Sequence, residues 1–395
     1  MTGEDTSQNR FRLGWFIAWA IVMLGLPAVL EDTHTLTVLT IWSLLALSLG
    51  LMWGYAGILS FGHAAYFGLG AYTYAIASIN LGESTGAIFL AMLVPTALAA
   101  MIGAMMFFGR ISDVYLGVIT LVVSLILFKF MNATAGDVYR IGDARLGGFN
   151  GIPGFPILNV PGDPSAQIWG TPFYYVVAIA LLLCYLLSRW ILSSAFGHVL
   201  MGIRENETRM ELLGYHVPLY KTAIFSISAA MAGLAGAFFA MWSEIVTPGL
   251  FALGQSAEVI IYVIVGGLGT LIGPMAGAMV IGGLKLMLGE QTLIDNSLVM
   301  GTILVLAVLL IPSGIAPQIA AWRKRRTHRF VSQRQQSSTR RRRGLAGHTD
   351  SAGSAGTGVS NHGGSHRSTA ASSEANSSGS GMSSSTSATR PGKRL

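Results

Sequence analysis

Long apolar runs recur through residues 1–322 and predict helices that cross a membrane. A hydrocarbon core about 30 Å thick is crossed by about 20 helical residues. Runs near that length occupy residues 13–30, 37–58, 61–80, 87–108, 114–131, 173–192, 222–242 and 298–316. The pattern therefore predicts an all-α fold, a polytopic transmembrane helix bundle.

A further apolar stretch, residues 256–288, is too long for one span and is interrupted by helix-breaking residues. The interruptions are Gly266, Gly267, Gly269, Gly273 and Pro274. Glycine costs about 1 kcal/mol and proline about 3 kcal/mol in a helix interior, so a break is expected here. We predict two helices or a re-entrant pair, which gives about eight to ten membrane elements in total.

Lysine and arginine in the short connecting segments orient the bundle, because positive charge is kept on the cytoplasmic side. The relevant residues are Arg10, Arg12, Arg110, Arg189, Arg204, Arg209, Lys221 and a basic C-terminal tail. With a return pass through 256–288, both termini face the cytoplasm. Residues 132–172 then form the longest outside loop, which is long enough for local structure of its own.

Composition agrees with a membrane protein and divides the chain into unlike parts. Hydrophobic residues make up 52% of the chain and charged residues 11%, against about 25% charged in soluble domains. We expect a cytoplasmic N-terminus at 1–12, a membrane domain at 13–317 and a basic, Ser/Gly-rich disordered tail at 318–395. The tail directly follows a span, so contact with anionic membrane lipid is favoured and binding of nucleic acid is unlikely.

Motifs for catalysis or cofactor binding are lacking from the sequence. No glycine-rich phosphate loop ends in Gly-Lys-Ser or Gly-Lys-Thr, so this chain is not expected to hydrolyse ATP. The histidines form no HExxH pair, and the single cysteine, Cys184, has no second cysteine for a metal site. We expect a protein that is not an enzyme, with no catalytic residue, metal or bound cofactor.

A charged segment, residues 196–221, interrupts the spans and predicts one short amphipathic helix. One side of that helix carries Val199, Leu200, Ile203, Met210 and Leu213. The opposite side carries Arg204, Glu205, Thr208, Arg209 and Glu211. Gly214 is expected to end the helix in the left-handed conformation. The polar side indicates a soluble partner, although a helix lying on the lipid surface has the same pattern.

The segment at residues 59–75 is a candidate for the translocation pathway or its gate. It places Ser60, His63 and Tyr66 among glycines and alanines near a predicted membrane boundary. Ionisable residues at membrane depth usually face the bundle interior or a cavity. His63 therefore either lines the pathway or forms a hydrogen bond that ties two helices together.

The second pathway candidate is the glycine-rich stretch that begins at Gly266, Gly267 and Gly269. Glycines at every fourth residue from Gly269 to Gly277 are typical of close helix packing. A broken half-helix that lines the substrate path is the alternative.

Four segments taken together resemble the branched-chain amino acid ABC transporter permeases, particularly the M-type (LivM-like) subunit. They are LSFGHAAYFGLGAYTYA at 59–75, LGGFNGIPGFP at 146–156, the charged segment with the following span at 196–238, and VGGLGTLIGPMAGA at 265–278. The resemblance covers about residues 13–317, and close relatives in the family serve urea and short amides. It implies a multi-pass protein of the bacterial cytoplasmic (inner) membrane.

The resemblance also implies partners for this chain. The charged segment would be a coupling helix that contacts ABC ATPase subunits through Arg204, Glu205, Asn206, Glu207 and Gly214. The outside loop would meet a substrate-binding protein at Gly148, Asn150 and Gly151. A sister permease subunit (H-type) would complete the pathway, and ATP would be used by the ATPase subunit.

The function implied is import of branched-chain or related amino acids by alternating access, driven by ATP. Urea or a short amide is the alternative substrate. A secondary transporter or channel driven by an ion gradient is the alternative from another class. It requires buried acidic residues, of which Glu258 is the clearest in the predicted spans, and it leaves residues 196–221 without a role.

Overall fold

The computed structural model describes residues 25, 27, 32–289 and 301–302. Apart from residues 25, 27 and 301–302, the predicted spans at 13–30 and 298–316 lie outside the described residues, as do the N-terminal segment and the basic tail. Eight of the predicted membrane elements can therefore be compared with the structure.

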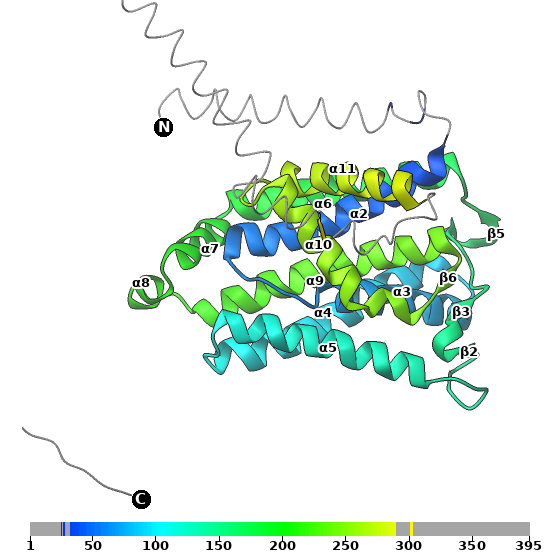
Figure 1. Cartoon of the computed structure of the whole chain (residues 1–395), viewed down its shortest axis with the longest axis horizontal. Coiled ribbons are helices and arrows are strands. Elements are labelled where there is room, and N and C mark those ends of the chain that lie inside the picture. The colour runs from blue at the N-terminus through cyan, green and yellow to red at the C-terminus, as the bar shows by residue number, and fades with distance from the viewer. Residues whose placement is uncertain (1–24, 26, 28–31, 290–300, 303–395) are drawn as a thin grey trace, which may run out of the picture. The chain divides into compact units, whose positions relative to one another are not determined.

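Helices make up most of the described chain and form a bundle (Figure 1). They are α2 (Thr33–Leu51), continued by the π-helix η1 (Met52–Ala56), then α3 (His63–Leu81), α4 (Ser84–Phe108), α5 (Asp113–Ala133), α6 (Thr171–Ser193), α9 (Val217–Ser243), α10 (Leu253–Gly266) and α11 (Ile272–Gly289). Among the described helices, five are long and apolar enough to cross a membrane: α2 with η1, α4, α5, α6 and α9. The predicted all-α membrane bundle is confirmed.

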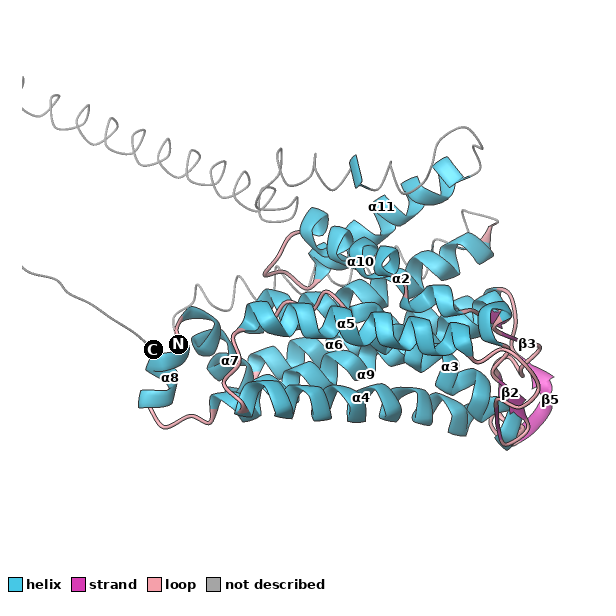
Figure 2. Ribbon diagram, turned by 60° about the horizontal axis from the view of Figure 1, so that its bottom comes forward, coloured by secondary structure: helices cyan, strands magenta, loops and turns pink. Residues whose placement is uncertain are grey.

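The bundle has two structurally different ends (Figures 1 and 2). One end carries two short helices, α7 (Ala195–Glu205) and α8 (Glu207–Leu212). The other carries the short strands β1 (Arg140–Ile141), β2 (Ala144–Arg145), β3 (Ile152–Pro153), β4 (Asn159–Val160), β5 (Asp163–Gln167) and β6 (Ile245–Val246), with the 3-10 turns η2 (Gly148–Asn150) and η3 (Pro248–Phe251). These strands form three antiparallel pairs, β1–β2, β3–β6 and β4–β5. Pairing of Ile152 with Val246 attaches the long loop to the segment that follows α9.

Helix α9 lies at the centre of the bundle, where its small residues allow close contact with α3 and α4. A Cβ at Gly70 of α3 would overlap the backbone of Gly233 in α9, and one at Gly236 would overlap the carbonyl oxygen of Phe67. Apolar side chains gain little from leaving lipid for a helix interface, so membrane helices depend on such close packing. The buried Ala229 and Ala237 belong to the same packed surface.

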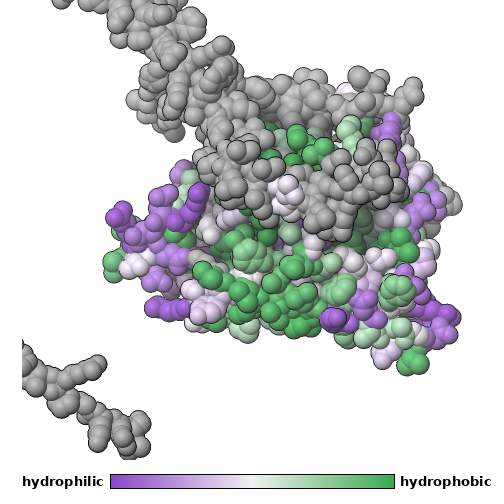
Figure 3. Space-filling model, viewed as in Figure 1, coloured by the Kyte–Doolittle hydropathy of each residue, from purple (hydrophilic) through white to green (hydrophobic). Residues whose placement is uncertain are grey.

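Large apolar side chains project outward from α4, α5 and α6. The most exposed include Phe89, Leu93, Met101, Met105, Val114, Phe130, Leu183 and Trp190. Figure 3 shows hydrophobic side chains gathered between two more polar ends. An apolar belt of this kind matches the hydrocarbon layer of a bilayer.

The stretch 256–288 forms two helices, α10 and α11, which both predicted arrangements contain. The chain turns between them at Gly267 and Gly269, whose φ angles of 106° and 82° lie in the region that favours glycine. A Cβ at Gly277 would overlap the carbonyl oxygen of Tyr262, so α10 and α11 pack backbone to backbone. This contact supports the packing role that the glycine spacing predicted.

Replacing Gly70 with alanine is expected to destabilise the bundle, because the added methyl group meets the Gly233 backbone. Overpacking of this kind costs about 1–3 kcal/mol. A thermal melt of the purified protein in detergent should show a lower Tm for Gly70→Ala. The matched control is Gly254→Ala, where a Cβ has no neighbour within 4 Å. Equal melting temperatures for the two variants would contradict this account of the α3–α9 contact.

Candidate functional site

The charged segment at one end of the bundle forms two helices, so the prediction of a single helix was wrong. Helix α7 ends at Glu205, and Asn206 adopts an extended conformation with φ −163° and ψ 103°. The Asn206 side chain accepts a hydrogen bond of 2.8 Å from the backbone N–H of Arg209. Asparagine is a favoured N-cap because it satisfies a free amide of the first turn, so Asn206 starts α8.

This break changes which residues face the bundle. Val199, Ile203 and Met210 are buried together, as predicted, in a cluster with Val217. Leu213, expected on the same side, is 67% exposed, because the break at Asn206 ends the helical periodicity on which that prediction relied. The predicted left-handed end is confirmed at Gly214, where φ is 89°.

Arg204, which was expected to contact a soluble partner, is exposed but also bonds to the bundle. Its guanidinium Nη1 donates a hydrogen bond to the carbonyl oxygen of Gly54 in η1. The side chain also lies against Gly57, where a Cβ would be 3.3 Å from Arg204 Cγ, and near Gly269 in the α10–α11 turn. One arginine therefore joins the charged segment to two elements of the membrane domain.

Glu207 likewise forms an internal contact. Its carboxylate pairs with the ammonium group of Lys221 near the start of α9. Lys221 is only 4% exposed, and its Nζ lies 5.5 Å from the centre of the Phe107 ring. Removing the partner of a buried charge is costly, so this ion pair anchors α8 to the bundle.

The remaining polar residues of the segment are turned toward its surroundings. Glu205, Thr208, Arg209 and Glu211 are exposed, as is Leu212 at 84%. All five residues expected to contact a partner, Arg204, Glu205, Asn206, Glu207 and Gly214, are exposed. Asn206 also caps α8, Gly214 ends it, and Arg204 and Glu207 also bond to the bundle, so their contact with a partner stays a prediction.

Ser60, His63 and Tyr66 are all buried, at 0–1% exposure. His63 Nε2 lies 2.7 Å from the hydroxyl of Ser48, which also lies 2.7 Å from the carbonyl oxygen of Leu45. A carbonyl only accepts, so the Ser48 hydroxyl donates to Leu45 and His63 Nε2 donates to Ser48. His63 therefore ties α3 to α2, which is one of its two predicted roles; its part in a gate stays a prediction.

Four buried polar atoms on α3 and the segment before it have no hydrogen-bond partner among the described residues: Ser60 Oγ, His63 Nδ1, Tyr66 OH and Tyr72 OH. Buried polar groups are normally satisfied by protein or water. Tyr66 and His63 are 5.9 Å apart between ring centres, so part of this set is contiguous. The cluster is a suitable place for ordered water inside the bundle.

At the opposite end, the glycines expected to meet a binding protein are packed inward. Gly148 and Gly151 have φ angles of 57° and 75° and are buried. A Cβ at Gly148 would lie 2.6 Å from Ala135, and one at Gly151 would overlap the carbonyl oxygen of Val246. These two glycines shape the loop, whereas Asn150 and the 74% exposed Phe149 form its outer surface.

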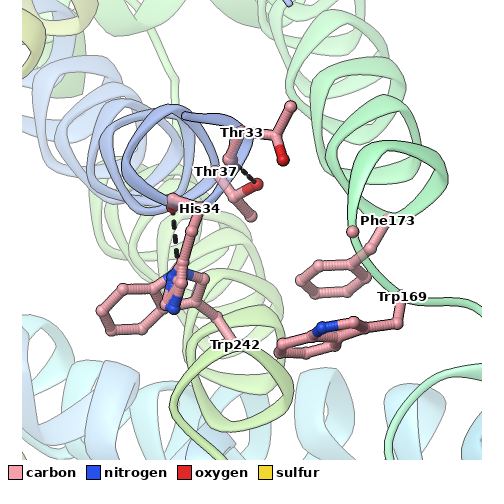
Figure 4. Close-up of a pocket in the computed structure, with 7 residues that line it drawn as sticks. Thr33, His34, Thr37, Trp169, Phe173 and Trp242 are labelled. Atoms are coloured by element: carbon pink, nitrogen blue, oxygen red, sulfur yellow. Dashed lines mark hydrogen bonds between the residues drawn. The ribbon is translucent and has the colours of Figure 1, made fainter. Parts of the chain in front are cut away.

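A small cavity of about 130 Å³ lies at this end between α2, α6 and α9 (Figure 4). It is lined by Thr33, His34, Thr37, Trp169, Gly170, Phe173 and Trp242. Trp242 Nε1 donates a 3.0 Å hydrogen bond to the carbonyl oxygen of His34, and the Trp169 and Phe173 rings stack at 6.0 Å. Tryptophan is enriched where spans meet the interface, but the three segments come together only in the fold, so sequence reasoning missed the cavity.

Asp32 begins α2 beside that cavity. Its carboxylate accepts hydrogen bonds of 3.1 Å from the amides of Thr35 and His34. Hydrogen bonding with Thr35, first through its side chain and then through its amide, holds the pKa of Asp32 below its usual range. The carboxylate therefore stays ionised at neutral pH and caps the helix.

Sequence reasoning also missed the partner of Glu258. Lys285 Nζ lies 2.6 and 2.7 Å from the two oxygens of that carboxylate, across α10 and α11. Glu258 and Lys285 are 27 residues apart in the sequence, so no short-range pattern predicted their contact. Within the described ranges, no group of three His, Cys, Asp or Glu side chains is placed to hold a metal ion.

Comparisons with known proteins agree with the resemblance. Residues 33–311 match the family described as branched-chain amino acid transport system / permease component. The chain is 27% identical over 344 residues to the high-affinity branched-chain amino acid transport system permease protein LivM of Escherichia coli (strain K12), covering 80% of this chain and 76% of that protein.

Two further relatives show similar identity. The protein of the same description from Salmonella typhimurium is 28% identical over 343 residues, covering 80% of this chain and 76% of the relative. A probable branched-chain amino acid transport permease protein LivM from Methanocaldococcus jannaschii is 26% identical over 235 residues, covering 51% and 65%. No solved structure matches the chain.

The Glu207–Lys221 pair yields a stability prediction. Glu207→Gln should lower the Tm in detergent, with a loss of about 1–3 kcal/mol, because a buried ammonium loses its carboxylate. Glu205→Gln, a neighbouring exposed glutamate, is the matched control and should melt like the unmodified protein. Adding Lys221→Met to Glu207→Gln should recover part of the loss; a double variant that melts lower than Glu207→Gln alone would argue against the ion pair.

Proposed function

This chain belongs to the family of permease components of branched-chain amino acid transport systems, and from that premise we propose that it imports amino acids with energy from a separate ATPase subunit. It acts as one transmembrane subunit of an ABC importer in the bacterial cytoplasmic membrane, with both termini on the cytoplasmic side. A second permease of the H-type and an external substrate-binding protein complete the assembly. Leucine, isoleucine and valine are the proposed substrates, by analogy with the relatives, which are branched-chain amino acid permeases.

The arrangement of α7 and α8 is the observation that carries this proposal. Their outward surface presents Glu205, Thr208, Arg209, Glu211 and Leu212, while their inward residues are bound to the bundle. We take Leu212 as the apolar centre of the contact and the charged residues around it as the polar rim, which is the usual arrangement of a protein interface. The ATPase subunit binds this surface.

The inward contacts supply the mechanical connection. Arg204 is bonded to η1 and lies near the α10–α11 turn, and Glu207 is bonded to the start of α9. When two ATPases close on ATP, a displacement of α7 and α8 is passed to these three elements together. Since packed interfaces resist gradual deformation, such a push favours a switch between discrete arrangements. The bundle thus alternates between outward and inward access.

At the outer end, the substrate-binding protein docks on the loop between α5 and α6. Asn150 and Phe149 are the exposed residues of the glycine-rich turn and form the contact. Gly148 and Gly151 act indirectly, by allowing the turn to pack on Ala135 and Val246.

An ion-gradient mechanism is less well supported by the charges of the described residues. Coupling to an ion would use a buried carboxylate that carries an uncompensated negative charge, and Glu258 was the clearest candidate. Both oxygens of its carboxylate instead accept hydrogen bonds from the Lys285 ammonium, which neutralises Glu258 within the chain. Urea or a short amide stays an alternative substrate, which transport assays with each solute distinguish.

Leu212→Asp is expected to weaken attachment of the ATPase. The change places a charge where the proposed contact buries an apolar side chain, which costs about 2 kcal/mol or more at a central contact. Tagged complex purified in mild detergent should then retain at least about tenfold less ATPase subunit. Val138→Asp, a 91% exposed valine at the opposite end, is the control. Full ATPase recovery with Leu212→Asp would exclude this surface.

Arg204→Met is expected to separate ATPase binding from transport. Because the Arg204 guanidinium is engaged by the Gly54 carbonyl, the variant should keep its ATPase subunit on purification. It should nevertheless import labelled leucine about tenfold more slowly in vesicles, since site-to-site coupling typically amounts to 1–3 kcal/mol. Arg209→Met, on the outward surface, should instead reduce ATPase recovery. If Arg204→Met lost the ATPase and Arg209→Met did not, the two roles would have to be exchanged.

A further inference from the structure

Two opposite charges face each other between the apolar helices α10 and α11. Glu258 lies on α10 and Lys285 on α11, and their side chains are 15% and 19% exposed. Charged groups within membrane segments cost about 2.5–3.5 kcal/mol each by insertion scales, and usually mark a pathway. An ion pair at this position therefore requires a specific structural or functional explanation.

Holding α10 against α11 is not a sufficient reason. These helices already meet through backbone contacts, because Gly277 packs on the Tyr262 carbonyl and Gly273 packs on Gly266. A buried ion pair adds little net stability compared with apolar residues of similar size, since desolvation offsets the attraction. Leucine or methionine at both positions would serve packing equally well.

The surroundings of the pair resemble a recognition site. The Tyr262 hydroxyl lies 3.4 Å from Glu258 Oε2 and is positioned to donate to it. The Lys285 ammonium lies 5.2 Å from the centre of the Trp42 ring, so an aromatic surface adjoins the charges. Each charged group also keeps part of its surface uncovered by the described helices.

We propose that Glu258 and Lys285 form an intramembrane half-site for zwitterionic α-amino acids, which rests on the proposed transport function. The carboxylate of Glu258 accepts hydrogen bonds from the solute's ammonium group, and the ammonium of Lys285 donates to the solute's carboxylate. Without solute, the two side chains neutralise each other. With solute, four charges alternate in sign and the net charge stays zero, which avoids an uncompensated charge in low dielectric.

The position of the pair connects it to the end of the bundle that carries α7 and α8. Glu258 and Lys285 lie on the two helices whose connecting turn, at Gly269, approaches Arg204. A movement of α7 therefore reaches the hairpin that carries the charges. The same site disfavours urea, which has neither an ammonium nor a carboxylate to separate the pair.

A first experiment uses the unmodified complex, with ATPase and sister permease but without binding protein, in phosphatidylglycerol nanodiscs. Binding of labelled leucine should be competed by unlabelled leucine. Leucinol, which lacks the carboxylate, and 4-methylpentanoate, which lacks the ammonium, should each compete at least about tenfold less well, because each loses a charge-assisted hydrogen bond. Equal competition by all three would overturn the proposal. Loss of leucine binding when the nanodiscs contain phosphatidylethanolamine would also overturn it, since the site would then bind a zwitterionic lipid headgroup.

A second experiment removes both charges with Glu258→Gln and Lys285→Met in one chain. The complex should keep its Tm and ATP hydrolysis, while leucine binding falls at least about tenfold. Asp137→Asn with Arg145→Gln removes an exposed ion pair at the outer end and should leave binding unchanged. Unchanged leucine binding in the first double variant would overturn the proposal, and so would a joint loss of Tm and binding, which would assign the pair to structure.

Failure of the proposed transport function gives a different result from failure of the half-site. If the unmodified complex with its binding protein shows no ATP-dependent leucine uptake in vesicles, the proposed function fails. If it imports leucine while the Glu258 and Lys285 double variant imports it equally fast, only the half-site is wrong.

Discussion

Backbone-to-backbone packing of α9 against α3 and α4 is the constraint on which the rest of the structure depends. In lipid, a large apolar side chain gains little by turning inward, so many of them remain on the outside of α4 and α5. Glycine and alanine permit the close approach that holds the centre instead, as at Gly70, Gly233 and Gly236. The same device joins α10 to α11 and leaves a compact frame for the polar contacts at its ends.

Three charged side chains within or beside this frame bind specific partners. Lys221 pairs with Glu207, Lys285 pairs with Glu258, and Arg204 donates to the Gly54 carbonyl. Each contact connects different elements, because a charge in a low-dielectric region is costly without a partner. The first and third fasten α7 and α8 to the membrane helices. A displacement at that end would consequently be shared by α9, η1 and the α10–α11 turn.

Predictions from sequence succeeded wherever a local property was sufficient. The lengths of apolar runs located the described spans, since span length follows from bilayer thickness. The glycines after α10 located the turn, and Gly214 was correctly expected in the left-handed region. The prediction of one helix over 196–221 failed at Asn206, because a capping hydrogen bond outweighed an apolar periodicity that continued past it. Leu213 was misplaced for the same reason.

The sequence by itself determined the class of protein, the approximate spans, the break after α10 and the segment that leaves the membrane, since each depends on neighbouring residues. Tertiary structure decided which residues of that segment face the bundle and which face outward. The partners of Arg204, Glu207 and Glu258 lie 150, 14 and 27 residues away. Whether such groups meet depends on helix packing throughout the bundle, and no local pattern of hydrophobic and polar residues contains that information.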